Sequence, residues 1–348
     1  MKKEGCRYGT HRVIFPEKVL PQTAQRIDNS LPIYDNELLV EVDTLNIDSA
    51  SFRQMKDACN HDIDSVKKMI LSIVKERGKQ QNPVTGSGGM LLGKVKEIGA
   101  KYPNIKNLKV GDKVASLVSL SLTPLQIDEI ITVFSDRDQV KIKGHAIFFA
   151  SGVLAKIPTD MPETLALAIL DVAGAPAQTY RLVKPNQNVV IIGAGGKSGS
   201  ICCAVARDIL GPTGKLIAIQ PSEKGRKRIN ELGYCDEVLG VDACSPVDCQ
   251  KEVARITNGE MADVVINCAP VENTEMSSIM CAKNNNYATV YFFTMATSFT
   301  KAALGAEGIG SDALLIIGNG YAPNHDLIAL DVVRKHKKLR ELFEKVYS

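Results

Sequence analysis

The sequence contains no apolar run that approaches 18 residues, no C-x-x-C pair and no large excess of either charge. The first absence argues against a membrane-spanning helix, which needs about 18 or more consecutive apolar residues. The formal net charge is only +3, so the strong positive field of a nucleic-acid-binding protein is not indicated. We therefore expect neither a membrane nor a nucleic acid among the partners.

The nine cysteines are scattered along the chain and odd in number. Without a C-x-x-C pair they fit neither a zinc ribbon nor a disulfide scaffold, and they are typical of reduced thiols in a cytoplasm. The sequence begins Met-Lys-Lys, but no apolar segment follows this start. We therefore expect no export signal and a cytoplasmic location.

The length of 348 residues predicts two domains, because one hydrophobic core seldom grows beyond about 250 to 300 residues. Short alternating stretches separated by turns fill residues 1–160 and predict a β-rich domain, with one amphipathic helix over 62–77. Strands and helices alternate over 161–348, which predicts a doubly wound parallel sheet with right-handed crossovers. The expected fold class is α/β. Single helices are expected over 162–183 and, at the C-terminus, over 327–346.

The second domain contains a glycine-rich turn after a buried strand, in the sequence N-V-V-I-I-G-A-G-G-K-S-G-S of residues 188–200. Such a turn at the start of a helix is typical of dinucleotide binding, because the helix N-terminus presents free N–H groups to a pyrophosphate. Gly193 is expected to reverse the strand, and Gly195 and Gly196 to let the backbone approach the phosphates. Gly199 is expected to let helix and strand pack closely.

Residues 196–198 also resemble the end of a P-loop, whose lysine contacts the terminal phosphates of a nucleotide. A P-loop requires a glycine five residues before the glycine of Gly-Lys, and Ile191 stands there instead. This spacing argues against a nucleoside triphosphatase. We assign Lys197 and Ser198 to the dinucleotide site.

The second strand of this domain is expected over residues 215–219, and the residues that follow it bear on the choice between NAD and NADP. A strand that favours NAD normally ends in an acidic residue that holds the ribose hydroxyls, but Gln220 stands here, followed by Ser222. No carboxylate repels a 2′-phosphate, so NADP remains open beside NAD. Basic Lys224 and Arg226 fit the exposed face of the next helix equally well. Later strand ends are expected to add Cys268, Ala269, Thr294 and Met295 to the cofactor site.

A compact β-rich domain, the turn Gly111-Asp112-Lys113-Val114 and a glycine motif about 80 residues later resemble the medium-chain dehydrogenase/reductase superfamily. The resemblance covers about residues 35–320. Asp48, the segment 86–90 and about Gly174 stand where zinc-dependent members carry two cysteines and a histidine. One aspartate cannot replace two thiolates and an imidazole, so the resemblance implies a branch without zinc.

Within that branch, residues 5–14, 19–22, 193–199 and 318–323 are similar to the diaminohexanoate dehydrogenase family of bacterial lysine fermentation. The resemblance implies oxidation of the 3-amino group of 3,5-diaminohexanoate to a ketone, with release of ammonium and reduction of NAD. A homodimer or homotetramer is implied by analogy with the superfamily. Two other functions remain open: an NADPH-dependent quinone or enone reductase on the same scaffold, and a non-catalytic NAD(P) sensor.

A substrate with two ammonium groups and one carboxylate should be held by carboxylate side chains and by an arginine or lysine. The superfamily position of Asp48 makes it our first candidate for facing an amine. Alternatively, it is a turn aspartate that hydrogen-bonds its own backbone. Tyr8, His11 and Arg12 are candidates for a lid or carboxylate clamp, or for a packed N-terminal strand. Weaker candidates, more often solvated, are Arg53 and Glu307.

Three polar residues, Tyr321, His325 and Asp326, follow the last expected strand, at the edge where open α/β sheets bind ligands. Tyr321 and His325 are therefore candidates for the catalytic site. Asp326 is a weaker candidate, because it could instead cap the terminal helix. His145 precedes an expected strand at residue 146, which favours a structural role at the strand end.

Overall fold

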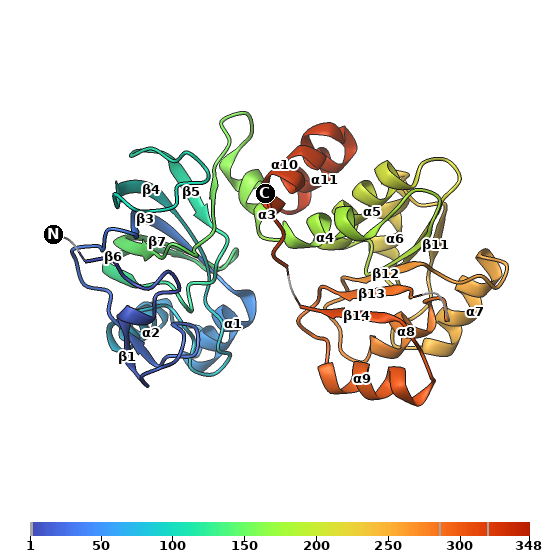
Figure 1. The fold of residues 1–348 in the computed structure, drawn as a ribbon, viewed down its shortest axis with the longest axis horizontal. Helices are drawn as coiled ribbons and strands as arrows, with labels where there is room; N and C mark the ends of the chain where they lie inside the picture. The colour runs from blue at the N-terminus through green and yellow to red at the C-terminus, as the bar shows by residue number, and fades with distance from the viewer. Residues whose placement is uncertain (1–2, 285–286, 319) are drawn as a thin grey trace. The chain divides into compact units, whose positions relative to one another are not determined.

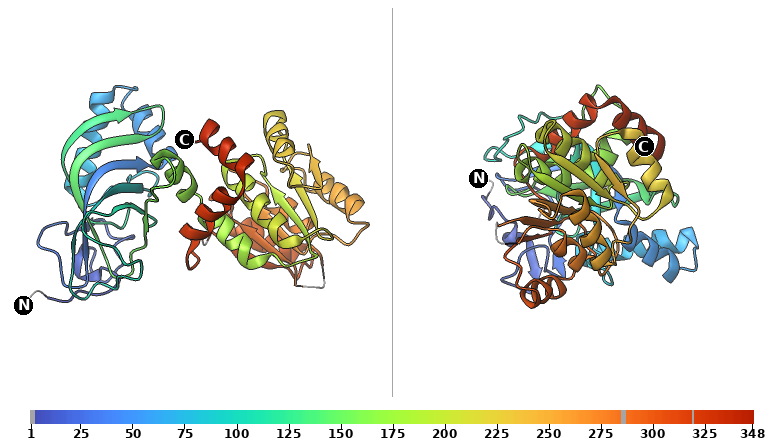
Figure 2. Two further views of the ribbon diagram at one scale, coloured as in Figure 1. Left: turned by 90° about the horizontal axis from the view of Figure 1, so that it is seen from above. Right: turned by 90° about the vertical axis from the view of Figure 1, so that its right-hand side faces the viewer.

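The computed structural model describes residues 3–284, 287–318 and 320–348 (Figures 1 and 2). The chain divides into two compact units, Met1–Glu163 and Thr164–Ser348. The first is built on an antiparallel sheet and the second on a parallel sheet. The predicted fold class is confirmed.

The first unit contains a six-stranded antiparallel sheet together with a short two-stranded one. The strand order of the large sheet is β6 (Leu125–Phe134), β7 (Gln139–Phe148), β3 (Leu38–Ile47), β4 (Gly89–Ile98), β5 (Lys113–Ser116) and β8 (Leu154–Lys156). The small sheet pairs β1 (Val13–Phe15), which follows the 3-10 turn η1 (Thr10–Arg12), with β2 (Arg26–Ile27).

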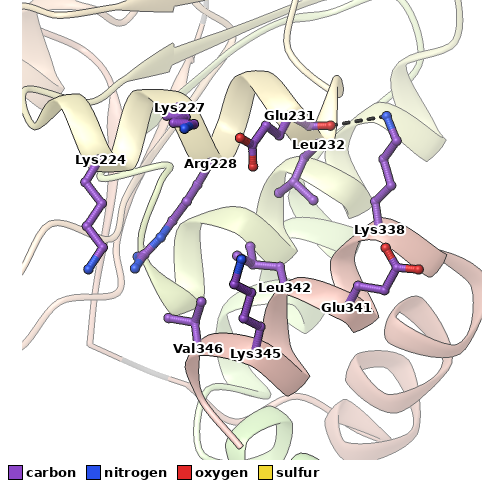
Figure 3. A pocket seen from close by; sticks show the side chains of 10 residues that line it. All are labelled: Lys224, Lys227, Arg228, Glu231, Leu232, Lys338, Glu341, Leu342, Lys345 and Val346. Atoms are coloured by element: carbon purple, nitrogen blue, oxygen red, sulfur yellow. Dashed lines mark hydrogen bonds between the residues drawn. The ribbon is translucent and has the colours of Figure 1, made fainter.

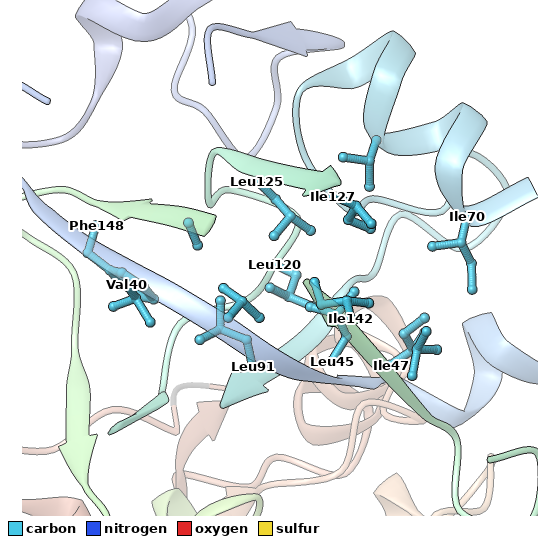
Figure 4. Packing of buried hydrophobic residues seen from close by; sticks show 14 of the residues in the cluster. Val40, Leu45, Ile47, Ile70, Leu91, Leu120, Leu125, Ile127, Ile142 and Phe148 are labelled. Atoms are coloured by element: carbon cyan, nitrogen blue, oxygen red, sulfur yellow. The ribbon is translucent and has the colours of Figure 1, made fainter. Parts of the chain in front are cut away.

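Two helices, α1 (Ser49–Ala58) and α2 (Ile63–Arg77), follow β3 in this unit. The apolar face of α2, which includes Ile70, joins the core that the large sheet forms (Figure 4). The helix ends at Gly78, whose φ of 70° is the left-handed conformation that glycine adopts most easily. The predicted helix over 62–77 is thus confirmed.

The second unit is a six-stranded parallel sheet. The strand order is β11 (Glu237–Leu239), β10 (Lys215–Ile219), β9 (Asn188–Ile192), β12 (Val264–Asn267), β13 (Thr289–Phe292) and β14 (Leu314–Ile317). Helices α5 (Lys197–Leu210) and α6 (Glu223–Leu232) lie on one face, and α8 (Glu275–Met280) and α9 (Phe299–Gly308) lie on the other (Figure 1). Helix α7 (Pro246–Ile256) packs against α8.

All six strands are parallel, but the order in which successive strands are added to the sheet reverses between β9 and β12. Strands β10 and β11 extend the sheet to one side of β9, and β12, β13 and β14 extend it to the other. In open α/β sheets such a reversal leaves a crevice at the carboxyl ends of the two strands, and ligands bind there. The glycine turn begins at the carboxyl end of β9, directly at this point.

Two helices predicted as continuous are each broken in the structure. Residues 162–183 form α3 (Glu163–Leu170) and α4 (Gly174–Leu182). Pro176 lies in the first turn of α4, where its missing N–H costs no helical hydrogen bond. The C-terminal segment forms α10 (His325–Lys335) and α11 (Lys337–Val346), separated by His336, whose Nε2 lies 3.0 Å from Asp208 Oδ2.

Candidate dinucleotide and substrate sites

Two glycines of the turn in the second unit, Gly193 and Gly199, show the backbone features predicted for them. Gly193 has a φ of 78°, and a Cβ atom there would lie 2.8 Å from the backbone nitrogen of Ala269. At Gly199 a Cβ would lie 2.3 Å from the carbonyl oxygen of Gly193, so helix and turn are in close backbone contact. Helix α5 begins at Lys197 with Gly196 as its N-cap.

A cavity of about 390 Å³ opens beside this turn and is lined by residues that follow the carboxyl ends of β10, β11 and β12. Seven residues of the predicted cofactor site line it: Gly193, Gly195, Gly196, Gln220, Ser222, Cys268 and Ala269. Sequence reasoning missed or did not assign nine others: Pro221, Lys224, Gly225, Arg228, Asp242, Ala243, Cys244, Pro270 and Val271. Part of this lining follows β11, whose three residues are too few to show an alternating pattern.

The side chain of Gln220 connects the glycine turn to helix α6. Its Oε1 accepts a hydrogen bond from the Gly195 backbone N–H at 2.9 Å, and its Nε2 donates one to Ser222 Oγ at 2.8 Å. Ser222 is the N-cap of α6 and accepts a hydrogen bond from the backbone N–H of Gly225. A neutral carboxamide therefore stands beside the glycine turn, with Lys224 lining the same cavity.

Four other residues predicted for the cofactor site are placed differently. The ammonium group of Lys197 pairs with the carboxylate of Asp171, so this lysine is not aimed at the cavity as a P-loop lysine would be. Ser198 is half-buried in the first turn of α5. Thr294 is nearly buried, Met295 is 88% exposed, and neither lines the cavity.

A second, wider cavity of about 800 Å³ lies between α6 and α11 (Figure 3). Leu232, Leu342 and Val346 are its apolar residues, and the charged residues around them are Lys224, Lys227, Arg228, Glu231, Lys338, Glu341 and Lys345. Lys338 Nζ donates a hydrogen bond to the backbone carbonyl of Glu231 at 3.2 Å. Long charged side chains of both signs over an apolar floor are typical of a solvated groove between two helices.

The candidate carboxylate clamp of the first unit holds an internal carboxylate instead. Arg12 is 1% exposed and makes two hydrogen bonds of 2.7 Å to the carboxylate of Glu37. His11 Nε2 lies 2.8 Å from the same carboxylate. Burial by itself raises the pKa of Glu37, but hydrogen bonds from Arg12, His11 and the Tyr34 backbone outweigh it and lower the pKa to about 2. Neither Arg12 nor His11 is a substrate clamp in this arrangement.

Tyr8, the third member of that candidate clamp, is 53% exposed. The guanidinium of Arg7 lies 5.1 Å from the centre of its ring. Two weaker candidates of the chain, Arg53 and Glu307, are also exposed. These placements agree with surface solvation.

Asp48 is the N-cap of α1, and its side chain is exposed. Its Oδ1 accepts hydrogen bonds from the backbone N–H groups of Ala50 at 3.1 Å and Ser51 at 3.3 Å. The alternative interpretation of Asp48, an aspartate bonded to its own backbone, therefore describes its local structure. Close to Asp48 lies a group of side-chain hydroxyls on Ser51, Thr85 and Ser87, which sequence reasoning did not identify as a group.

The polar residues after β14 lie at the start of α10. His325 and Asp326 are buried in its first turn, and Tyr321 is 53% exposed. The rings of Tyr321 and His325 meet edge to face with centroids 5.4 Å apart. Asn324, not Asp326, is the N-cap of this helix.

His145 lies inside β7 rather than before a strand, which corrects the predicted boundary. Its Nε2 atom is buried without a hydrogen-bond partner. Burial lowers the pKa of this imidazole and favours its neutral form. The predicted boundary failed because Gln139–Phe148 is one continuous strand paired with both β3 and β6.

The three positions that correspond to zinc ligands in the superfamily have other surroundings here. Asp48 caps a helix, Ser87 belongs to the hydroxyl group, and Gly174 packs against the backbone of Gly320. Within residues 3–284, 287–318 and 320–348, no set of three or more His, Cys, Asp or Glu side chains is arranged to hold a metal ion. Across the same ranges, the helices are all too short or too polar to cross a membrane.

The second unit has the 3-2-1-4-5-6 strand order of a dinucleotide-binding sheet, with the glycine turn at its reversal point. Together with the antiparallel first unit, this defines a medium-chain dehydrogenase/reductase fold. The CurK enoyl reductase superposes with a TM-score of 0.54 at 16% identity, over 93% of this chain and 82% of that one. An alcohol dehydrogenase from Thermotoga maritima gives a TM-score of 0.54 at 14% identity, over 90% and 86%.

Sequence comparison identifies the family within this fold. Residues 11–158 match the L-erythro-3,5-diaminohexanoate dehydrogenase N-terminal domain. Over 344 residues, 99% of each chain, the protein is 55% identical to the L-erythro-3,5-diaminohexanoate dehydrogenase of Acetoanaerobium sticklandii. It is 52% identical over 345 residues, again 99% of each chain, to the enzyme of that name from Fusobacterium nucleatum. The chain belongs to the L-erythro-3,5-diaminohexanoate dehydrogenase family, as its sequence predicted.

Proposed function

We propose that this protein oxidises L-erythro-3,5-diaminohexanoate to 5-amino-3-oxohexanoate and ammonium, with reduction of a nicotinamide cofactor, as a step of lysine fermentation. The observation that carries the proposal is the 55% identity to a dehydrogenase of this name over 99% of both chains. The glycine turn and its cavity supply a cofactor site of the expected kind.

The reaction consumes one water for each amino group removed. The 3-ammonium group loses a proton, hydride leaves C3, water adds to the resulting iminium carbon, and the C–N bond then breaks with its electron pair on nitrogen. The bound nicotinamide supplies the hydride acceptor. In balance, R₂CH–NH₃⁺, NAD(P)⁺ and H₂O give R₂C=O, NH₄⁺, NAD(P)H and H⁺. The protein must therefore accept a proton from the amine and another from water.

The residues of the cavity fit a dinucleotide. Helix α5 follows the turn formed by Gly193, Gly195 and Gly196, and no side chain within the described residues caps its N-terminus, so its backbone N–H groups suit a pyrophosphate. At the ribose end, Gln220 offers an uncharged carboxamide. In the first unit, the exposed carboxylate of Asp48 suits a substrate ammonium group.

NAD is the cofactor we propose first, because the family resemblance implies it. NADP is a second candidate, which Ser222, Lys224 and Arg228 favour because all three line the cavity next to Gln220. A hydroxyl and two cations suit a 2′-phosphate, and no carboxylate follows β10 directly to repel it. Among solved structures of this fold, a mycobacterial protein in complex with NADPH superposes with a TM-score of 0.54 at 15% identity, over 95% of this chain and 88% of that one.

We also propose that the enzyme works without zinc, in the cytoplasm, as a homodimer or homotetramer. The donor chemistry at Asp48, Ser87 and Gly174 does not suit zinc, which prefers thiolate and imidazole ligands. The free cysteines are compatible with a reducing compartment. Metal analysis of the active protein and light scattering after size-exclusion chromatography test the first and last of these statements.

The direct test mixes the purified protein with 3,5-diaminohexanoate and offers NAD and NADP separately. We expect nicotinamide reduction and ammonium release in equal amounts. A quinone or enone reductase would instead oxidise NADPH with an enone and ignore the diamine. An NAD(P) sensor would bind cofactor without turnover on either. The Asp48→Asn variant separates the first two functions, since it should impair only the reaction of a substrate with an ammonium group.

A further inference from the structure

The hydroxyl groups of Ser51, Thr85 and Ser87 form a compact cluster in the first unit, here named the hydroxyl cluster. Ser51 Oγ lies 2.5 Å from Thr85 Oγ1 and 2.5 Å from Ser87 Oγ, and the latter two are 3.4 Å apart. Ser51 is fully buried, Ser87 is half-buried and Thr85 is exposed. The cluster therefore leads from a buried centre to the surface.

Proton counting shows that the hydroxyl cluster is able to both donate and accept further hydrogen bonds. Ser51 has one hydroxyl proton, so it donates to one neighbour and must accept from the other. The neighbour that receives the Ser51 proton can direct its own proton to the third hydroxyl, 3.4 Å away, or turn it to an outside partner. Each hydroxyl oxygen also has two lone pairs. The cluster thus suits a ligand group that is first a donor and later an acceptor.

The hydroxyl cluster is connected to Asp48 through the backbone of Ser51. The backbone N–H of Ser51 donates to Asp48 Oδ1 at 3.3 Å. Gly89 pairs with Ile47 in the β3–β4 ladder, so Ser87 and Asp48 lie at the same end of these two strands. A Cβ at Gly89 would lie only 2.7 Å from the backbone nitrogen of Asp48, so the two chains approach each other closely here.

The loop 82–87 is held in place by Asn82, so its position does not depend on the hydroxyl cluster. Its Nδ2 donates to Gln54 Oε1 at 2.7 Å and to the Ser51 carbonyl at 3.3 Å. Its Oδ1 accepts from the backbone N–H of Val84 at 2.7 Å, and its own N–H donates to the Ser87 carbonyl at 2.9 Å. This network closes the loop and attaches it to α1.

We propose that Thr85 and Ser87 bind the reacting 3-amino group of the substrate beside Asp48, and then hold the water that replaces it, while buried Ser51 positions both hydroxyls. This inference rests on the proposed function. An ammonium group donates hydrogen bonds to the carboxylate and to hydroxyl lone pairs. Before hydride leaves C3, the ammonium group gives one proton to solvent through the Asp48 carboxylate. Once the iminium has formed, the hydroxyls hold the water through both kinds of hydrogen bond. The C–O bond then forms as a water proton passes through the cluster to nitrogen. The C–N bond breaks with its electron pair on nitrogen, while the proton of the new hydroxyl passes to the leaving ammonia.

The test compares Thr85→Val with Thr85→Ser. Valine has nearly the shape of threonine but no hydroxyl, whereas serine keeps the hydroxyl and loses only a methyl group. We expect Thr85→Val and Ser87→Ala each to lower kcat/KM for the diamine by about 10- to 100-fold. This is at or below the roughly 10²- to 10⁴-fold that general acid–base catalysis contributes, because the other hydroxyl remains in each variant. Thr85→Ser should stay within about twofold of the wild type. NADH affinity, measured by fluorescence, should be unchanged in all three variants.

The outcomes separate two failures. A wild-type protein that reduces neither cofactor with the diamine overturns the proposed function and this inference with it. An active wild type whose Thr85→Val and Ser87→Ala variants keep their kcat/KM overturns the inference alone. A purely structural role for the hydroxyls predicts a lower melting temperature in Thr85→Val without a change in kcat of the folded protein, so the melting temperature is recorded beside the kinetics. If either variant is unfolded, the other carries the same test.

Discussion

Gln220 Oε1 accepts a hydrogen bond from the backbone N–H of Gly195 over 2.9 Å. The contact places an uncharged carboxamide beside the glycine turn, where NAD-binding sheets usually present a carboxylate to the ribose hydroxyls. The same side chain donates to Ser222, so its orientation is fixed from both ends. On the proposed assignment of this cavity to the dinucleotide, Gln220 is the residue that should influence the choice between NAD and NADP.

Replacing Gln220 by aspartate tests this influence. A carboxylate at this position repels a 2′-phosphate and accepts hydrogen bonds from ribose hydroxyls, so we expect the ratio of kcat/KM for NAD to that for NADP to rise about tenfold or more. Steady-state kinetics with each cofactor at saturating diamine measure this ratio. Gln250→Asp, with the same charge change on α7, is the control and should leave the ratio unchanged. An unaltered ratio in Gln220→Asp would remove this residue from cofactor selection.

Two glycines of positive φ provide a matched test of the cofactor turn. Gly193 and Gly211 have φ values of 78° and 67°, so an alanine strains the backbone at both positions, by about 1–3 kcal/mol. Only Gly193 also lacks room, since a Cβ there meets the backbone of Ala269, while Gly211 has nothing within 4 Å. We expect Gly193→Ala to weaken NADH binding at least about tenfold and Gly211→Ala to leave it nearly unchanged. Equal affinities in the two variants would contradict the assignment of the turn.

Sequence patterns correctly predicted those structural features whose cause lies within a few residues along the chain. The glycine motif and the helix ending at Gly78 are recognised because each signal lies within a few residues. The break at His336 was missed because its reason, contact with Asp208, lies more than 100 residues away in the sequence. Periodicity alone continues through such a break.

Long-range polar contacts explain what the sequence could not predict about the candidate sites. Arg12 was a candidate ligand because a lone arginine near the N-terminus gives no sign of Glu37, with which it pairs. The hydroxyl cluster joins Ser51 to Thr85 and Ser87 across an intervening helix, and serine and threonine are too common for such a pairing to stand out. Residue type predicts chemistry, but burial and partners decide whether the group is available.

Removing one partner of the buried pair of Arg12 and Glu37 should strongly destabilise the first unit. Glu37→Gln leaves the Arg12 cation buried without its counter-charge, which typically costs about 3–5 kcal/mol. Denaturant unfolding at pH 7 measures this loss. Glu4→Gln, which breaks the exposed pair with Lys101, is the control and should change stability little. A loss in Glu37→Gln no larger than in Glu4→Gln would show that the pair adds nothing to stability.

The same carboxylate gives the wild type a defined acid sensitivity. The pKa of Glu37 is lowered from its ordinary value of 4.5 to about 2, so the folded state binds fewer protons than the unfolded state between these values. Its stabilising contribution is complete above about pH 4.5 and is lost as the pH falls towards 2. We expect the unfolding free energy of the wild type to decrease over this range more steeply than that of Glu37→Gln. Parallel curves for the two proteins would contradict the lowered pKa.

Lys79 should make stability depend on pH in a second, more alkaline range, because its pKa is lowered by burial. The side chain is fully buried, and its Nζ donates to the backbone carbonyl oxygens of Pro21 at 2.6 Å and Gln22 at 3.3 Å. Burial lowers the pKa of Lys79 from 10.5 to about 7, and nearby Arg77 adds to the effect. Between these two values the unfolded chain binds more protons than the folded one, so stability should rise with pH, by at most about 1.4 kcal/mol per pH unit.

Lys79→Met tests this dependence through the slope of unfolding free energy against pH rather than through its value at one pH. The absolute stability combines two opposed effects, removal of a buried cation and loss of a donor to two carbonyl groups, whereas the slope reports proton binding alone. Denaturant unfolding between pH 7 and 10 should show a rise in the wild type that is smaller in Lys79→Met. Lys75→Met, at an exposed position of α2, removes the same charge and should keep the wild-type slope. If Lys79→Met keeps it as well, Lys79 has an ordinary pKa and remains charged in the folded protein.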